Sequence, residues 1–196
     1  MKQKRDAAGL TAEIRDSART VGSLVEEVDA LVAIGQRLIA TLKRGGKLLT
    51  AGNGGSAAEA LHMAEELVGR FKSDRRSLPA VALVADATAL TCIGNDFGFD
   101  EVFRRQVEGL GRSGDMLVLF STSGRAANLQ LALRAARKRK VVTVALLGRD
   151  GGPMAGCADY EIVVRGQETA RIQEAHQVIL HLLLGMVERA FVRTRA

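Results

Sequence analysis

The pattern of apolar positions divides the chain into two parts. Between Leu10 and Leu42, apolar residues recur at the spacing of amphipathic helices. Asp29 is a residue type that caps helices, so it predicts a bend between two helices, the second of which should end at Gly45 and Gly46. The apolar stripe on these helices needs a partner surface, which is either the rest of the same chain or a second subunit.

From Lys47 onward, short apolar runs alternate with helical stretches. The runs end in polar or glycine-rich segments, which is typical of strands in a sheet covered on both faces. The runs expected to be strands are residues 48–51, 80–85, 116–120, 141–147 and 160–164. Their alternation with helices predicts an α/β fold with a doubly wound, five-stranded parallel sheet. We expect residues 1–46 to form an N-terminal helical region and residues 47–196 to form the sheet domain.

Composition narrows the classes of function. No apolar run is long enough to span a bilayer, and no apolar segment follows the basic N-terminus, so we expect a cytoplasmic protein without a membrane partner. Cys92 and Cys157 are too few and too far apart for a disulfide framework or a cysteine-based zinc site. The net charge of +6 is scattered along the chain, and the chain has no Trp and one Tyr. Aromatic platforms for bases are therefore mostly missing, and we expect no nucleic-acid partner.

The loop after the first expected strand has the features of an anion site. Residues 52–56 read Gly-Asn-Gly-Gly-Ser and lead directly into an Ala-rich helix. Backbone N–H groups at a helix start favour a phosphate, and glycines allow it to come close. On that helix His62 and Glu66 lie four residues apart on one face, a spacing that suits a metal or acid–base centre but is also common in surface pairs. Glu65 competes for the role, but we expect it to point away from His62.

A second loop, Ser-Thr-Ser-Gly at residues 121–124, follows the third expected strand and opens a helix near Ala126. Its hydroxyl groups offer neutral donors to a phosphate monoester, although Ser and Thr also cap helices for structural reasons alone. Two such loops at strand ends favour a sugar phosphate as ligand, since ligands of this architecture bind beyond the carboxyl ends of the strands. Arg125 follows immediately and is an alternative phosphate partner. Neither loop fits the P-loop or the dinucleotide motif.

Residues 171–181 supply three further candidates, Gln173, His176 and His181. On one regular helix, Gln173 and His181 would lie about 12 Å apart along the axis. Zinc bonds of about 2.0–2.2 Å would make it difficult for both to reach one ion, unless Gln173 precedes the regular helix or the two residues come from different chains. Together with the apolar N-terminal helices, this spacing predicts a homo-oligomer with sites shared between subunits.

The motifs are most specific when they are combined. They are GNGGS, H-x-x-E-E-L-x-G-R, IGNDFGF at residues 93–99, STSG, and RIQE-x-H with another His eight residues after the Gln. Over nearly the whole chain, this combination resembles the phosphoheptose isomerase family of sugar isomerase (SIS) domain proteins. The resemblance implies a flavodoxin-like SIS fold and a homotetramer. It also implies an aldose–ketose isomerase that converts sedoheptulose 7-phosphate to D-glycero-D-manno-heptose 7-phosphate through an enediol, for bacterial surface polysaccharide (lipopolysaccharide) biosynthesis.

The same resemblance implies the residues of the active site. One zinc ion per subunit would be bound by His62, Glu66, Gln173 and His181. The substrate would be bound by Asn53, Gly54, Gly55, Ser56, Asn95, Asp96, Ser121, Thr122 and Ser123, with Glu66 and Gln173 shared between substrate and metal. Glu66 would be the base and His181 the acid of proton transfer between C1 and C2. A carboxylate bound to zinc is a weaker base than a free one, so either Glu66 leaves the metal during turnover or another group moves the proton.

Two positions depart from the family pattern. Ala126 stands where some members carry a Ser that contacts the substrate, a loss on the order of 1 kcal/mol for one neutral hydrogen bond. Ala170 stands where some carry an Asp, which leaves a third acid–base group in question. Other SIS proteins bind the replication initiator without isomerase activity, or only sense a sugar phosphate. Retention of all four metal-matching residues argues against the first of these alternatives, and metal content would separate them.

Overall fold

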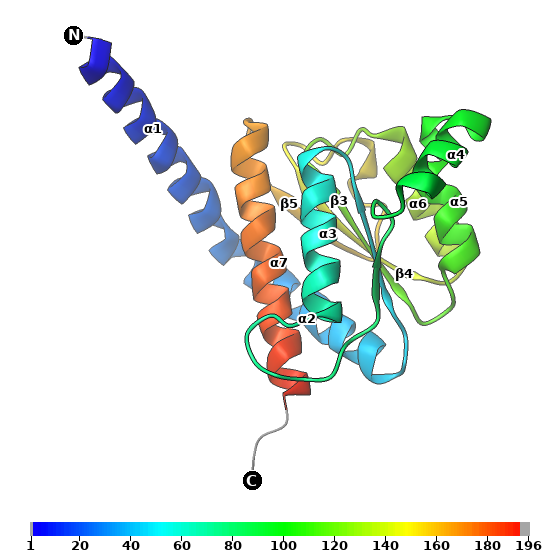
Figure 1. Cartoon of the computed structure of the whole chain (residues 1–196). Helices are drawn as coiled ribbons and strands as arrows, with labels where there is room; N and C mark the ends of the chain where they lie inside the picture. Colours follow the sequence, from blue (N-terminus) through cyan, green and yellow to red (C-terminus); the bar gives the residue numbers. More distant parts are fainter. Residues whose placement is uncertain (1, 193–196) are drawn as a thin grey trace.

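The computed structural model describes residues 2–192, which form a parallel sheet with helices on both sides (Figure 1). The strands are β1 (Leu48–Gly52), β2 (Ala80–Ala82), β3 (Met116–Ser121), β4 (Val142–Gly148) and β5 (Tyr160–Val164). They pair in parallel in the order β2-β1-β3-β4-β5. The chain enters the sheet at the inner strand β1, adds the edge strand β2 on one side, and then crosses over to add β3, β4 and β5 on the other, so the predicted doubly wound fold is confirmed.

The helices connect these strands and extend the chain at its N-terminus. They are α1 (Lys2–Gly22), α2 (Val28–Lys43), α3 (Gly55–Val68), α4 (Ala87–Phe97), α5 (Val102–Leu110), α6 (Ala127–Lys138) and α7 (Thr169–Phe191), with short 3-10 helices η1 (Ser23–Glu27), η2 (Phe99–Glu101) and η3 (Gly152–Met154). In the part of the chain that the structure describes, no helix combines the length and apolar character needed to cross a membrane.

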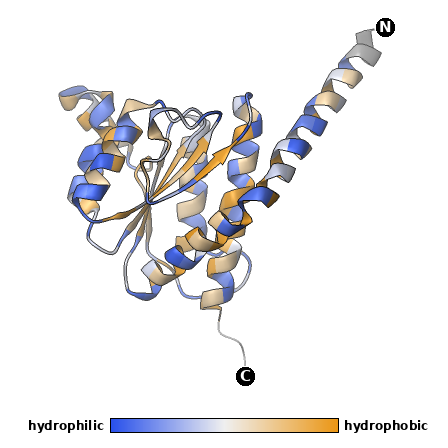
Figure 2. Ribbon diagram, turned by 180° about the vertical axis from the view of Figure 1, so that it is seen from behind, coloured by the Kyte–Doolittle hydropathy of each residue, from blue (hydrophilic) through white to orange (hydrophobic). Residues whose placement is uncertain are grey.

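The central strand β3 is continuously apolar because both of its faces are covered. Met116, Val118 and Phe120 pack against α2, α3 and α7 on one face of the sheet, whereas Leu117 and Leu119 pack against α5 and α6 on the other. All five side chains are fully buried, as expected for a strand covered on both faces. Figure 2 shows the strands as the most uniformly apolar part of the molecule. The carboxyl edge of this rigid sheet carries the two candidate loops.

The N-terminal helices differ from expectation in one detail. α1 projects away from the sheet and continues through η1 into α2, so the predicted bend between two helices is present (Figure 1). Asp29 does not cap the second helix. The cap position is occupied by Glu27, and Asp29 follows it inside the first turn of α2. The chain enters α2 from a 3-10 helix rather than from an extended segment. The prediction of an Asp29 cap was therefore wrong.

The strand at the sheet edge is shorter than predicted. β2 ends at Ala82 instead of continuing to Ala85, because the chain turns where the Ala85 N–H donates to the Ala82 carbonyl over 3.0 Å. The turn leads to Asp86, whose carboxylate accepts a hydrogen bond from the Ala89 N–H at 2.9 Å and caps α4. Residues after Ala82 therefore serve the entry to a helix rather than the sheet. The other strands agree with prediction to within one residue at each end.

Candidate active site

The two loops predicted to bind an anion lie side by side. β1 and β3 are neighbours, with Gly52 paired to Phe120, so the loops that follow them leave the same edge of the sheet. A cavity of about 240 Å³ opens between them. The predicted substrate residues that line it are Asn53, Gly55, Ser56, Ser121, Thr122, Ser123 and Gln173. Its walls thus present hydroxyl and amide groups at the start of α3, where a phosphate is favoured.

Glycines in the first loop allow other groups to come close to its backbone. Gly54 has φ +57° and ψ −122°, a backbone conformation that side chains disfavour. A Cβ at Gly55 would overlap the amide of Gln173, so α7 can approach the loop only because Gly55 has no side chain. Asn53 is held by Asn128 of α6, since their side-chain amides exchange two hydrogen bonds of 2.9 Å. Asn128 is a supporting residue that the motifs did not identify.

The second loop is held by its own hydroxyl groups. Ser121 is buried, and its Oγ accepts a hydrogen bond of 3.0 Å from the Gly124 N–H. The alternative phosphate partner, Arg125, is exposed and forms an ion pair of 2.9 Å with Asp150. Its guanidinium charge is therefore already matched by a carboxylate, which favours the neutral donors of the loop as the phosphate partners.

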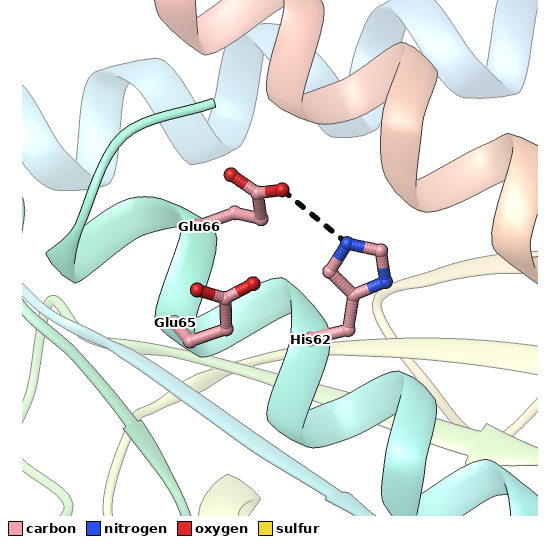
Figure 3. A group of neighbouring side chains, drawn as sticks. All are labelled: His62, Glu65 and Glu66. Atoms are coloured by element: carbon pink, nitrogen blue, oxygen red, sulfur yellow. Dashed lines mark hydrogen bonds and ion pairs between the residues drawn. The ribbon is translucent and has the colours of Figure 1, made fainter. Parts of the chain in front are cut away.

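The helix α3 brings a histidine and two carboxylates together (Figure 3). His62 Nε2 and Glu66 Oε1 lie 3.4 Å apart, as the four-residue spacing predicts. The expectation that Glu65 points away was wrong, because the ligand atoms of His62, Glu65 and Glu66 all lie within 4.8 Å of one another. Residues three apart are also neighbours on a helix surface, and a flexible Glu side chain can turn toward the histidine. Glu65 is nevertheless exposed, whereas Glu66 is partly buried.

The spacing of the His62 and Glu66 atoms fits one zinc ion. Two ligands on a tetrahedral zinc with bonds of about 2.0–2.2 Å lie about 3.3–3.6 Å from each other. The observed 3.4 Å between His62 Nε2 and Glu66 Oε1 falls in this range without any movement of the side chains. An imidazole and a carboxylate are also both ordinary zinc ligands. The pair can therefore provide two ligands as it stands.

The helix α7 packs beside α3 and brings His181 to the same place. The rings of His62 and His181 are 5.2 Å apart in an edge-on arrangement, and His181 stacks on Phe71 at 5.8 Å. Burial lowers the pKa of His181 below its ordinary value of 6.5, and electrostatic repulsion from nearby His62 and Lys72 lowers it further against the opposing effect of Glu66. His181 is thus held toward its neutral form, which is the form that binds metals.

His62 and His181 meet within one chain. The helix α7 starts at Thr169, so Gln173 does not precede it and lies on the same continuous helix as His181. The side chain of Gln177, halfway between them, contacts both histidines. The two histidines therefore come together without a second chain, while the sharing of the site between subunits stays a prediction.

Gln173 lies between the candidate metal ligands and the two candidate phosphate loops. A second cavity, of about 440 Å³, is lined by Gly55, Glu59, His62, Gln173 and Gln177 among others. Gly55 and Gln173 border both this cavity and the one between the loops. The two cavities therefore adjoin at Gly55 and Gln173, and together they are called the groove below. A phosphate at one end and a carbonyl at the other could be held by the same elongated ligand.

The third histidine has a different environment. His176 is completely buried, with Nε2 3.2 Å from the Leu147 carbonyl oxygen and Nδ1 3.7 Å from Glu59 Oε2. Its ring packs edge-on against Phe120. His176 therefore supports the core behind the groove rather than lining it.

Two predicted substrate residues lie apart from the groove. Asn95 and Asp96 are exposed near the end of α4, where the Asn95 amide donates to Asp96 Oδ1 at 2.8 Å. No residue of α4 is buried, and α4 packs mainly on α5 and η2. Neither residue lines the two cavities described above. The described residues of one chain therefore do not bring them to the loops.

Comparison with known proteins identifies the class. A sequence model of the SIS domain family matches residues 13–148. The chain is 49% identical over 181 residues to a phosphoheptose isomerase from Geobacter sulfurreducens, a match that covers 92% of this chain and 96% of the relative. Among solved structures, the phosphoheptose isomerase from Neisseria gonorrhoeae matches with a TM-score of 0.85, 42% identity and coverage of 96% and 100% of the two chains. That from Francisella tularensis matches with a TM-score of 0.87, 30% identity and coverage of 96% and 99%.

The parallel sheet with two phosphate-type loops at its carboxyl edge defines a SIS-domain protein. Within that class, the chain belongs to the phosphoheptose isomerase family.

Proposed function

We propose that the protein is an aldose–ketose isomerase that converts sedoheptulose 7-phosphate to D-glycero-D-manno-heptose 7-phosphate. Family membership supports this reaction. The observation that carries it is the groove in which Gly55 and Gln173 join the phosphate-type loops to His62 and its neighbours. Such a groove suits a ligand with a phosphate at one end and a carbonyl at the other.

Each part of the groove has a task in the reaction. The loop containing Ser121, Thr122 and Ser123 binds the phosphate, which fixes the far end of the sugar. Glu66 removes a proton at one of the two carbons, C1 and C2, and returns it to the other. His181 supplies a proton to the oxygens of the enediol through a ring N–H. Gln173 lies between these ends and orients the sugar chain.

We propose that the site holds one zinc ion, bound by His62, Glu66, Gln173 and His181. The 3.4 Å spacing of His62 Nε2 and Glu66 Oε1 supports this proposal, as does the neutral state favoured for His181. When bound, zinc would polarise the carbonyl and stabilise the negative charge of the enediolate. Gln173 and His181 are about 12 Å apart along the axis of α7, so their side chains would have to extend toward each other to reach one ion.

We propose that the reaction takes place in the cytoplasm and serves the synthesis of heptoses for bacterial surface polysaccharide.

The isomerisation is tested by incubation of the purified protein with sedoheptulose 7-phosphate and detection of the aldose by NMR, together with zinc analysis. An isomerase should produce the aldose and contain about one zinc per chain. A SIS protein that only senses a sugar phosphate or binds the replication initiator would produce none.

Substitution of the two candidate phosphate-binding residues, Ser123 and Arg125, should affect substrate binding differently. Ser123→Ala should raise KM about 5-fold, because the loss of one neutral hydrogen bond costs about 1 kcal/mol. Arg125→Ala should change KM by less than about 2-fold, since Arg125 is exposed and paired with Asp150. Steady-state kinetics of both variants provide the comparison. A larger effect from Arg125→Ala would mean that the phosphate is bound by charge.

We propose that the protein is a homo-oligomer, and a tetramer by the family resemblance. Apolar side chains along α1 and η1 support this: Leu10, Ile14 and Val25 have exposed fractions of 62%, 69% and 76% in one chain. Size-exclusion chromatography with light scattering should give an oligomer for the parent protein. Ile14→Asp should shift it toward smaller species, because the charge would be buried in the interface. A monomeric, fully active parent protein would contradict the proposal.

We further propose that Asn95 and Asp96 act in the groove of a neighbouring subunit. Their exposed position on α4 supports this, because they lie outside the groove of their own chain. Inactive His62→Ala protein mixed with inactive Asp96→Ala protein should regain activity. Mixing His62→Ala with His181→Ala should not, since the two rings lie 5.2 Å apart within the same chain. The reverse pattern of recovery would contradict this division of the site.

A further inference from the structure

Gln177 occupies the centre of the histidine cluster, although no motif points to it. It lies on α7 four residues from both Gln173 and His181, so it shares their face of the helix and lies about 6 Å along the axis from each. We propose that Gln177 is a positioning residue of the zinc site: its amide holds His62 and His181 together and fixes which nitrogen of His62 faces Glu66. The inference rests on the zinc site proposed above.

The contacts of the Gln177 amide are short and involve both histidines. Its Nε2 lies 2.6 Å from His62 Nδ1 and 3.2 Å from His181 Nε2. An amide nitrogen carries two hydrogens and can donate one to each ring. The opposite nitrogen of His62, Nε2, lies 3.4 Å from Glu66 Oε1. The His62 ring is thus held at both nitrogens, by Gln177 on one side and Glu66 on the other.

With its nitrogen toward His62, the Gln177 amide favours one tautomer of the ring. An imidazole that accepts a hydrogen bond at Nδ1 carries its proton at Nε2, so His62 donates to Glu66. When a metal takes the place of that proton at Nε2, the proton must reside on Nδ1. The Gln177 amide can turn over and present its oxygen to the Nδ1 hydrogen. Histidines that bind metals almost always donate their other N–H to such an acceptor, which fixes the ring orientation. One side chain thus suits both states of His62.

The position of Gln177 also distinguishes it from a ligand. Gln177 contacts the edge of the His62 ring that carries Nδ1. The nitrogen whose distance from Glu66 suits a shared zinc ion is the other one, Nε2. Removal of the amide would leave His62 Nδ1 without the partner it has here and free the ring to rotate. Loss of the Gln177 amide should therefore weaken metal binding without changing which residues bind the metal.

The test compares three variants of the full-length protein. Gln177→Leu retains the size of the side chain without its polar group, Gln177→Glu retains an acceptor for the His62 N–H, and Gln36→Leu is a control on the exposed surface of α2. Affinity for Zn²⁺ and Co²⁺ is measured by competition with a chelator. Gln177→Leu should bind about 10- to 100-fold more weakly, the usual effect of losing such a supporting partner. Gln177→Glu and Gln36→Leu should stay within about 3-fold of the parent, and the visible spectrum of bound Co²⁺ should be unchanged in all three variants.

A second readout does not depend on metal. In the metal-free parent protein, ¹⁵N–¹H NMR of the imidazole should show His62 protonated at Nε2, and Gln177→Leu should convert it to a mixture of tautomers. Unchanged metal affinity and an unchanged tautomer in Gln177→Leu would overturn the positioning role. A changed Co²⁺ spectrum would overturn it as well, since Gln177 would then be a ligand. A parent protein that binds no metal but shows the expected NMR response would refute the zinc site and leave the control of His62 by Gln177 established.

Discussion

Replacement of Glu66 by Gln is expected to lower kcat for the isomerisation of sedoheptulose 7-phosphate by about a thousand-fold or more. The change removes the proposed base, and general base catalysis alone contributes about 10²- to 10⁴-fold. It also removes a charged ligand of the proposed zinc ion, and the polarisation that a metal supplies is worth several kcal/mol, with each 1.4 kcal/mol equal to a factor of ten. Glutamine has nearly the size of Glu, so the packing of α3 should persist. Kinetics, zinc analysis and thermal unfolding of the variant provide the measurement.

Glu65→Gln is the matched control, because Glu65 is the adjacent residue of the same helix and its carboxylate also lies near His62 (Figure 3). Its exposure to solvent should make it dispensable. We expect Glu65→Gln to retain about one zinc per chain and kcat within about 3-fold of the parent. Loss of zinc from Glu65→Gln together with retention in Glu66→Gln would shift the ligand assignment by one residue.

The fold could be predicted from the sequence because the relevant signals are local. The apolar runs of β1 and β3 are short and end in glycine or hydroxyl residues, and parallel strands bring such ends to one edge. The errors are also local in origin. Asp29 has the chemistry of a helix cap, but the preceding 3-10 helix continues the chain into α2. The end of β2 depends on a turn that the apolar pattern does not reveal.

The histidine–carboxylate pair was predictable because its residues share one element. His62 and Glu66 were identified from their spacing on one helix, and the structure brings them to 3.4 Å. Gln177 was missed because its importance comes from packing between α3 and α7, which no spacing within α7 encodes. Glu65 was misjudged for a related reason, since helix geometry fixes the direction of Cβ but not the torsions of a long, exposed side chain.

The largest effect on stability is expected away from the groove, at Glu188 near the end of α7. Its buried carboxylate accepts hydrogen bonds from the backbone N–H groups of Lys72, at 2.9 Å, and of Ser73. It also forms an ion pair of 3.3 Å with Arg75, whose side chain is 1% exposed. Arg75 in turn donates to the carbonyl oxygen of Glu66 at 2.6 Å. This network attaches the segment after α3 to α7, and thereby holds Phe71 against His181.

Glu188→Gln should lower the free energy of unfolding by about 3–5 kcal/mol, because it leaves the buried guanidinium of Arg75 without a matching charge. Urea unfolding at pH 7 measures the loss. Arg19→Ala is the control: it breaks an exposed pair with Asp16 and should cost less than about 1 kcal/mol. The double variant Arg75→Leu with Glu188→Leu should lose less than Glu188→Gln if the uncompensated charge is the cause. Equal stability of Glu188→Gln and the parent would mean that solvent reaches Arg75.

The pH dependence of the same variants tests the charge on Glu188 directly. Burial alone would raise the pKa of this carboxyl, but the hydrogen bonds from Ser73, Lys72 and Arg75 outweigh it and hold the pKa below the ordinary value of 4.5. A carboxyl with a lowered folded pKa binds fewer protons in the folded state, so its stabilising contribution is complete above 4.5 and is lost as the pH falls through the folded pKa. The stability advantage of the parent over Glu188→Gln should therefore be constant from pH 7 to about pH 5 and shrink in more acidic solution. An advantage that stayed constant down to pH 3 would show that the ionised carboxylate is not what stabilises the fold.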